Sequence, residues 1–179
     1  LLPDGKVLVT GGQSRGKPLT LTEIYDPVTG KWTETGGMAQ ERTEHDSALL
    51  KDGRVLATGG GRSTAPLAST ELYDPATGTW TTTGDMIQPR VFFRLVALHD
   101  GRALAIGGRT TGRTDIANTE VYNPDTGTWS AAGDMSQSRT RHTATVLEDG
   151  RVLVTGGGNK AVYTSSAEIF DPATDTWTL

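Results

Sequence analysis

A nine-residue stretch recurs four times along the chain. It is written DGKVLVTGG at residues 4–12 and returns at residues 52–60, 100–108 and 149–157 as DGRVLATGG, DGRALAIGG and DGRVLVTGG. Four tryptophans keep the same step of 48 or 49 residues, namely Trp32, Trp80, Trp129 and Trp177. Self-similarity at a fixed period of this length is typical of repeat architectures. The chain is therefore predicted to fold as four copies of one structural unit.

Each unit carries the signals of short antiparallel strands. In the second unit, HDSALL (45–50) and RVLATGG (54–60) flank a tight turn whose Asp and Gly tolerate positive φ. STELYD (69–74) and TWTTT (79–83) flank a second turn, DPATG. Helical periodicity is absent. Four strands repeated at this period predict an all-β fold, a β-propeller, in which radial blades leave only short sheet edges.

A second set of markers gives the units a family resemblance. Each has a double glycine and then an aromatic residue seven positions before its tryptophan. This pattern resembles the kelch repeat over essentially the whole chain, and we expect its residues to serve the packing of the blades. They are Gly11, Gly12, Tyr25 and Trp32; Gly59, Gly60, Tyr73 and Trp80; Gly107, Gly108, Tyr122 and Trp129; Gly156, Gly157, Phe170 and Trp177.

The repeats divide one kelch β-propeller domain, residues 1–179, into approximately 1–38, 39–86, 87–135 and 136–179. If each innermost strand follows the segment after the motif methionine, the first blade lacks that strand, and about 15 strands remain rather than 16. Unpaired strand edges are prone to association. We therefore expect part of a larger ring, a ring completed by a partner such as a second copy, or a closed ring with one short blade.

Composition excludes several other classes of protein. Because 17 Lys or Arg stand against 21 Asp or Glu, a nucleic-acid partner is not expected. No apolar run approaches the roughly 20 residues of a membrane-spanning helix. The chain has no cysteine, which excludes disulfides and thiolate metal sites, and no cofactor or metal is expected. The compartment stays open, although we favour an extracellular or periplasmic location over a cytoplasmic one.

Length variation indicates which face binds a ligand. The spacing from tryptophan to the next Asp-Gly is 20 residues each time, whereas the double glycine and the motif glutamate are 11 residues apart three times and 12 once. The one insertion therefore lies in the loop between the second and third strands of a blade. Because loops carry function on rigid scaffolds, we expect binding at residues 13–20, 61–68, 109–118 and 158–165.

Basic residues gather on the same face, just before each innermost strand. They are Arg42, His45, Arg90, Arg94, Arg139, Arg141 and His142. Guanidinium groups in the channel mouth would form a cationic ring that recognises carboxylates. Alternatively, each repeated arginine pairs with an acid or a carbonyl of the neighbouring blade, because a residue that recurs with the repeat usually serves the repeat. Phe93 takes the histidine position in the third repeat, which disfavours a metal site.

Two functions are compatible with the resemblance. The first is a non-catalytic scaffold that recognises a protein, peptide or glycan through the variable loops. The second is a carbohydrate-active kelch enzyme, a sugar-acid epimerase or an oxidase of the galactose oxidase type, with a site in the central channel. The oxidase cofactor implied by that family needs a cysteine, which the chain lacks, and we find no convincing acid–base pair for an epimerase. We favour the scaffold and assign no catalytic residue.

Overall fold

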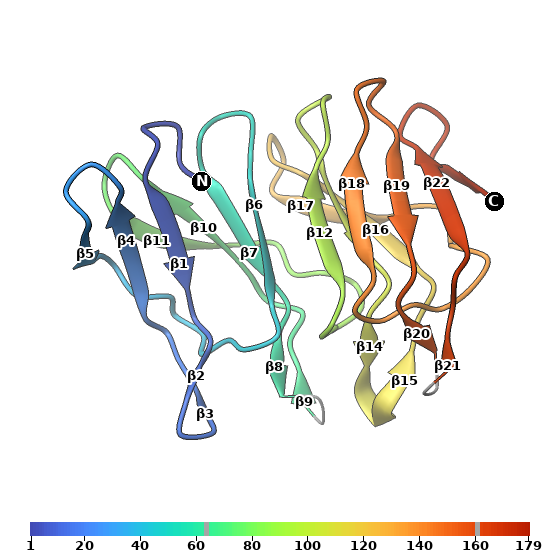
Figure 1. Cartoon of the computed structure of the whole chain (residues 1–179), viewed down its shortest axis with the longest axis horizontal. Coiled ribbons are helices and arrows are strands. Elements are labelled where there is room, and N and C mark those ends of the chain that lie inside the picture. Colours follow the sequence, from blue (N-terminus) through green and yellow to red (C-terminus); the bar gives the residue numbers. More distant parts are fainter. Residues whose placement is uncertain (63–64, 160–161) are drawn as a thin grey trace.

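The computed structural model describes residues 1–62, 65–159 and 162–179 of the chain. In these ranges three blades are four-stranded antiparallel sheets and one blade is three-stranded. The blades stand side by side in chain order, and the first and last lie at opposite ends of the array (Figure 1). No described strand joins the last blade to the first. The predicted all-β fold of four propeller blades is confirmed, with the first blade lacking its innermost strand.

The strands of each blade follow one another as an up-and-down meander. Blade 1 contains β1 (Val7–Thr10), β4 (Thr22–Asp26) and β5 (Lys31–Glu34). Blade 2 contains β6 (Asp46–Leu49), β7 (Val55–Thr58), β10 (Thr70–Asp74) and β11 (Thr79–Thr83). Blade 3 contains β12 (Arg94–Ala97), β13 (Ala103–Ile106), β16 (Thr119–Asn123) and β17 (Thr128–Ala131). Blade 4 contains β18 (Thr143–Val146), β19 (Val152–Thr155), β22 (Ala167–Asp171) and β23 (Thr176–Thr178).

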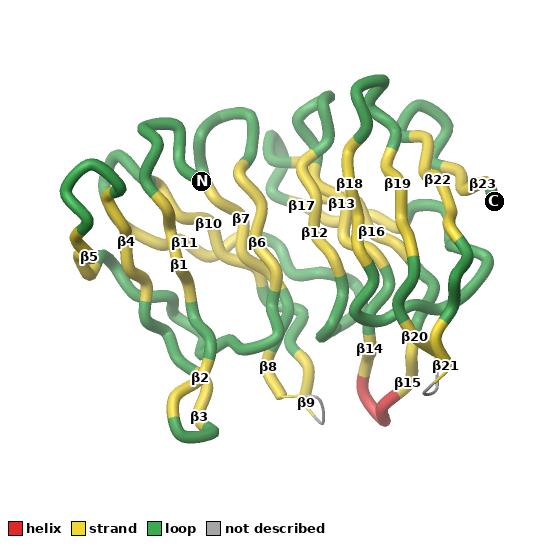
Figure 2. Tube along the Cα trace, in the orientation of Figure 1, coloured by secondary structure: helices red, strands yellow, loops and turns green. Residues whose placement is uncertain are grey.

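Each loop between the second and third blade strands folds back as a two-stranded ribbon. The ribbons pair β2 (Gln13–Ser14) with β3 (Lys17–Pro18), β8 (Gly61–Arg62) with β9 (Ala65–Pro66), β14 (Arg109–Thr110) with β15 (Thr114–Asp115), and β20 (Gly158–Asn159) with β21 (Val162–Tyr163). The third ribbon, which is one residue longer, holds a turn of 3-10 helix, η1 (Thr111–Arg113). All four ribbons project from one edge of the array, the ribbon face, and the Asp-Gly turns form the opposite edge, the turn face (Figure 2).

The segments that join one blade to the next cross the ribbon face. These link segments are residues 35–45, 84–93 and 132–142. Each forms a backbone bridge with a ribbon or its flank, through the pairs Leu19 with Arg42, Val91 with Arg109, and Thr140 with Gly158. This confirms that the variable loops and the blade connections share a face. In the described ranges, no helix has the length and apolar character needed to cross a membrane.

The core consists of the apolar faces of neighbouring blades. Leu56 of blade 2 and Tyr122 of blade 3 belong to one cluster, and Leu104 of blade 3 and Phe170 of blade 4 belong to the next. Because the inner blades are covered on both faces, β7 and β13 are buried at all four residues, as their continuous apolar sequences require. Blade 1 is covered on one face only, so Trp32 is 53% exposed.

The double glycine marks the point where the second strand leaves its blade. At Gly59 φ is +63°, and a Cβ would lie 2.8 Å from the carbonyl oxygen of Arg90 in the next link segment. A left-handed conformation costs a residue with a side chain roughly 1–2 kcal/mol. The glycine therefore allows two blades to approach each other, and no helix follows it in the described structure that could make it a phosphate loop.

A hydroxyl pair joins the outer strand of one blade to the aromatic residue of the next. Thr83 Oγ1 lies 2.8 Å from the hydroxyl of Tyr122, and an equivalent contact joins blades 1 and 2. Phe170 takes the tyrosine position in blade 4, and Ala132 takes the threonine position before it. Hydroxyl and partner are lost together, so that the change leaves no buried polar group unpaired.

Candidate functional site

The three repeated arginines lie inside the blade junctions and not in an open channel mouth. Arg42, Arg90 and Arg139 have no exposed surface. Each forms an ion pair with the motif glutamate of the following blade, which is Glu71, Glu120 or Glu168. The cationic ring expected from the sequence is therefore not formed by these side chains, because burial keeps them from any ligand. Their contacts agree with the alternative, in which each repeated arginine pairs with an acid of the neighbouring blade.

Arg42 illustrates how completely such a junction is satisfied. Its Nε and Nη2 donate to Glu71 Oε1 at 3.3 and 3.0 Å, and Nη2 also donates to Ser69 Oγ at 2.9 Å. Its Nη1 donates to the carbonyl oxygens of Gly59 and Ser69, each at 2.8 Å. The Glu71 carboxylate also accepts the backbone N–H of Ala39 at 2.6 Å. All five guanidinium donors are used, and they fix the link segment to β10, the third strand of blade 2.

Of the two histidines of the predicted site, one is fully buried and the other, His45, is partly buried. His142 has no exposed surface, and neither ring nitrogen has a hydrogen-bond partner among the described residues. His45 Nε2 lies 2.8 Å from Thr10 Oγ1. Burial, together with nearby arginine charge, lowers the pKa of both imidazoles to about 4. Phe93 at the equivalent position is 1% exposed, so this is a packing position and not part of a channel mouth.

Arg94 opens the innermost strand of blade 3 and lies near an acid. Its side chain is 44% exposed, and its Nη1 lies 3.9 Å from Asp46 Oδ2 on the innermost strand of blade 2. Asp46 Oδ2 also accepts the backbone N–H of Leu95 at 2.9 Å. Burial raises the pKa of the Asp46 carboxyl. Arg94 thus reaches solvent, but its charge lies next to that of an inter-blade aspartate.

One position in each link segment combines an unusual backbone with a changing side chain. Glu44, Phe92 and Arg141 have φ values of +56°, +58° and +55°. Non-glycine residues seldom adopt this left-handed conformation. The backbone strain that it causes persists only where the surrounding structure holds the residue in place. The repeat fixes the backbone here but not the residue type, since an acid, an aromatic ring and a base occupy the three copies. This variation contrasts with the constant, buried arginine two residues earlier.

Phe92 lies close to two guanidinium groups on the ribbon face. Arg141 Cζ is 4.1 Å from the centroid of the Phe92 ring, and Arg109 Cζ is 5.8 Å from it. Both distances are within the range of cation–π contacts. Arg109 Nε also donates to Asp115 Oδ1 at 2.6 Å. Arg141 is exposed and has no acidic partner in the described ranges, so it presents a positioned, unpaired cation.

A pocket of about 340 Å³ opens beside this cluster, between the third and fourth ribbons. It is lined by Arg109, Thr140, Arg141, Gly157, Gly158 and Tyr163. Tyr163 is 90% exposed and adds an aromatic surface at the ribbon. No acidic residue lines this pocket. Of the seven basic residues predicted for the site, only Arg141 lines this pocket. Arg109, Gly158 and Tyr163 lie within the predicted binding loops, whereas Phe92, beside the pocket, was not predicted.

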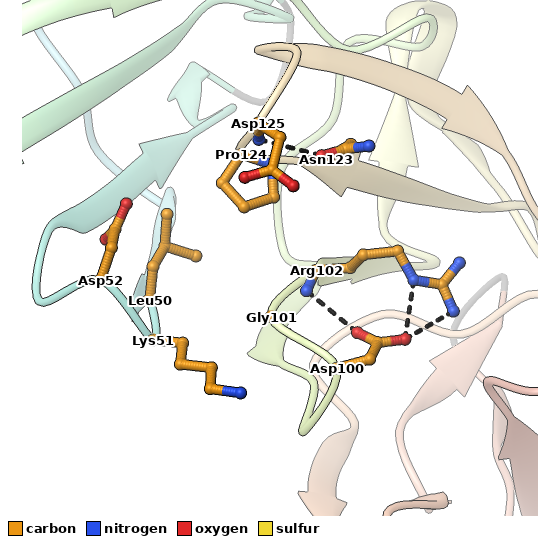
Figure 3. A pocket seen from close by; sticks show the side chains of 9 residues that line it. All are labelled: Leu50, Lys51, Asp52, Asp100, Gly101, Arg102, Asn123, Pro124 and Asp125. Atoms are coloured by element: carbon orange, nitrogen blue, oxygen red, sulfur yellow. Dashed lines mark hydrogen bonds and ion pairs between the residues drawn. The ribbon is translucent and has the colours of Figure 1, made fainter.

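A second pocket, of about 350 Å³, lies on the turn face between blades 2 and 3. Figure 3 shows its wall, where Asp100 and Arg102 are paired with each other and Asp125 is held by its own turn. Closely similar pockets lie at the junctions on either side, lined by the equivalent turns. This pocket therefore recurs with the repeat and is a product of blade geometry. No group of three His, Cys, Asp or Glu that could hold a metal occurs among the residues described.

Positive charge is concentrated in the four ribbon loops. The four ribbon loops contain six Lys or Arg and one Asp, on a chain whose net charge is −4. Arg15, Lys17 and Arg113 are exposed there. The turn face carries the repeated aspartates of the Asp-Gly turns. The link segments beside the ribbons add four acids, Glu41, Glu44, Asp85 and Asp134, so the excess of positive charge is local to the ribbons. Local positive charge attracts and orients partners of negative charge.

Comparison with known proteins identifies the family of the repeats. The family model described as Kelch motif matches residues 2–39, 47–87, 92–136 and 138–179. A search of the curated proteins returned no match.

Proposed function

Because the chain belongs to the kelch-repeat family, whose repeats generally mediate protein–protein interactions, we propose that it is a non-catalytic scaffold that binds a partner protein through its ribbon face. The observation that carries this proposal is the stack of Arg141 on Phe92. The two side chains occupy the left-handed link position, whose residue type the repeat leaves free. A side chain that the fold does not require is available for recognition.

The partner that fits this site is an acidic segment of another protein. Arg141, stacked on a ring, keeps the N–H edge of its guanidinium free for a carboxylate, which it can bind through two parallel hydrogen bonds. The rings of Phe92 and Tyr163 offer apolar surface for the carbon atoms of the same segment. The pocket of about 340 Å³ is at the small end of ligand sites, so it accommodates a few side chains of a peptide. The basic ribbons extend the same preference over the face.

Isothermal titration calorimetry with two peptides tests the proposal. The peptides are identical except that the glutamates of one are glutamines in the other. We expect the acidic peptide to bind, and its affinity to fall as salt is added, since surface charges are screened. Arg141→Ala is expected to weaken binding about tenfold, in line with the loss of a charged hydrogen bond.

The matched control is Arg151→Ala. Arg151 is an exposed arginine of the turn face, with 47% of its side chain accessible, and its replacement changes the net charge equally. It should leave the affinity unchanged. Equal weakening by both variants would mean that only net charge matters and would contradict a site at Arg141. An acidic glycan is the third ligand, and its preference over the acidic peptide would assign the site to carbohydrate instead of protein.

A further inference from the structure

The left-handed link position differs in charge from one link segment to the next. It holds Glu44 in the first segment, Phe92 in the second and Arg141 in the third. Glu44 and Arg141 are exposed, and Phe92 is half-buried. Each of these link segments joins two described blades. The chain thus presents an acid, an aromatic ring and a base at one equivalent backbone position of three successive segments.

Contacts between the link segments place these three positions in a row. The backbone N–H of Arg141 donates to the carbonyl oxygen of Phe92 at 2.9 Å. Where the first two innermost strands begin, Asp46 Oδ2 accepts the backbone N–H of Leu95 at 2.9 Å. These strands begin two residues after Glu44 and Phe92, so the first and second positions are neighbours as well. The acid and the base therefore lie on opposite sides of the ring.

The charges at the two ends of the row are available to a ligand. Neither Glu44 nor Arg141 has an ion pair or a side-chain hydrogen bond among the residues that the structure describes. The nearest arginine in sequence to Glu44 is Arg42, whose donors are all used within its own junction. Arg94 lies close to a different acid, Asp46. Glu44 is thus an exposed carboxylate that no described cation neutralises.

An extended peptide matches the spacing of this row. Alternate residues of an extended chain point to the same side and lie about 6–7 Å apart. The hydrogen bond between Phe92 and Arg141 implies a similar step, since residues paired in this way have Cα atoms about 5.5 Å apart. A peptide that crosses the link segments can therefore place three alternate side chains over the three positions.

We propose that the partner segment carries an acid, an apolar residue and a base at alternate positions, which lie on Arg141, Phe92 and Glu44. This inference rests on the proposed function, in which Arg141 binds a carboxylate, and it adds the base and its place. Complementary charges fix the register of a partner and suppress wrong ones. A segment that is acidic throughout would bring a second carboxylate to Glu44, where like charges repel. Glu44 is therefore the residue that distinguishes this partner from a uniformly acidic one.

Three synthetic peptides test the inference, namely GSEALAKSG, GSEALAQSG and GSEALAESG. They differ only in the residue that is expected to face Glu44, and all keep the glutamate for Arg141 and the leucine for Phe92. Fluorescence anisotropy of the labelled peptides at low salt measures their affinity for the full chain. We expect the lysine peptide to bind about threefold more tightly than the glutamine peptide, and the glutamate peptide about threefold more weakly, as one exposed charge pair allows.

Two variants of the protein distinguish a site at Glu44 from an effect of net charge. Glu44→Arg places in the first link segment the residue that Arg141 already provides at the same left-handed backbone position. It should reverse the order of the peptides, so that the glutamate peptide binds most tightly. Glu148→Arg makes the same change of charge at an exposed residue of the turn face and should keep the wild-type order.

The results also separate this inference from the proposed function. Equal binding of the three peptides, or an unchanged order in Glu44→Arg, would overturn the inference; if Arg141→Ala still weakened all three, the site for an acidic segment would stand. Reversal of the order by Glu148→Arg would assign it to net charge and would also overturn the inference. If no peptide binds, or if Arg141→Ala changes nothing, the proposed function and the inference fail together.

Discussion

At the scale of single residues, the blade junctions contain a buried neutral histidine as well as buried ion pairs. His142 is fully buried beside Arg139 and without a hydrogen-bond partner in the described ranges, and its pKa is lowered to about 4. In the unfolded chain the pKa of an imidazole is near its ordinary value of about 6.5. The unfolded state therefore binds a proton at a higher pH than the folded state does, and stability falls as the pH drops from 6.5 towards 4.

Replacing this imidazole should remove that part of the pH dependence. His142→Phe copies the residue that Phe93 places at the equivalent buried position. Between pH 7 and pH 4 the free energy of unfolding of the variant should fall by about 3 kcal/mol less than that of the wild-type protein, as a pKa displacement of this size implies. Urea unfolding at pH 7, 5 and 4 measures the difference. His99→Phe, at an exposed histidine, should retain the wild-type pH profile; a parallel loss in His142→Phe would refute the assignment.

The residues of the candidate site could be predicted from the sequence only in part. The step of 48 or 49 residues that repeats the arginines also repeats the motif glutamates, so their pairing was open to prediction as one alternative. The stack around Phe92 was not, because it depends on two left-handed residues, one on each of two link segments, and on a ribbon that folds back beside them. No sequence period records such a contact, since its members differ between repeats.

At the scale of elements, the blade strands pack against each other through apolar side chains, and the link segments join successive blades through buried ion pairs. The strands were predictable because each has a continuous or alternating apolar pattern. The ribbons were predicted only as loops, because strands of two residues have no alternation to detect. Three of the four are fixed by a backbone bridge to a link segment, a contact between parts of the chain that are distant in sequence.

A double-mutant cycle measures how much one link depends on its ion pair. Arg90→Ala and Glu120→Ala each leave a buried charge without its partner, which typically costs about 3–5 kcal/mol. Glu120→Ala should be the more damaging change, because the backbone N–H groups of Ile87 and Gln88 also lose their acceptor. The double variant Arg90→Ala with Glu120→Ala should lose less than the sum of the two single changes, because no buried charge is then left without its partner. Urea unfolding provides the free energies, and strictly additive losses would contradict a coupled pair.

At the scale of the whole molecule, the described strands of each blade pack against the blades that neighbour it in sequence. The number of blades was predictable because the period can be counted, but the shape of the array was not. The repeated residues specify the contact between adjacent blades, and they carry no information about where a row of such contacts closes. All three forms of ring closure left open by the sequence are therefore compatible with the same packing between adjacent blades. In the structure the four blades form an open array (Figure 1).

An array with nearest-neighbour packing should open from its ends. In such proteins stability is approximately a sum over units and their interfaces, and regions with few buried contacts open at lower free energy. β7 and β13 are buried at all four residues, whereas β1 has none of its four residues fully buried and β19 has two. Hydrogen exchange followed by mass spectrometry should therefore find the slowest amides in β7 and β13 and the fastest strand amides in blade 1, where all four residues of β5 are exposed. Equal protection in all four blades would mean that the array unfolds as one cooperative unit.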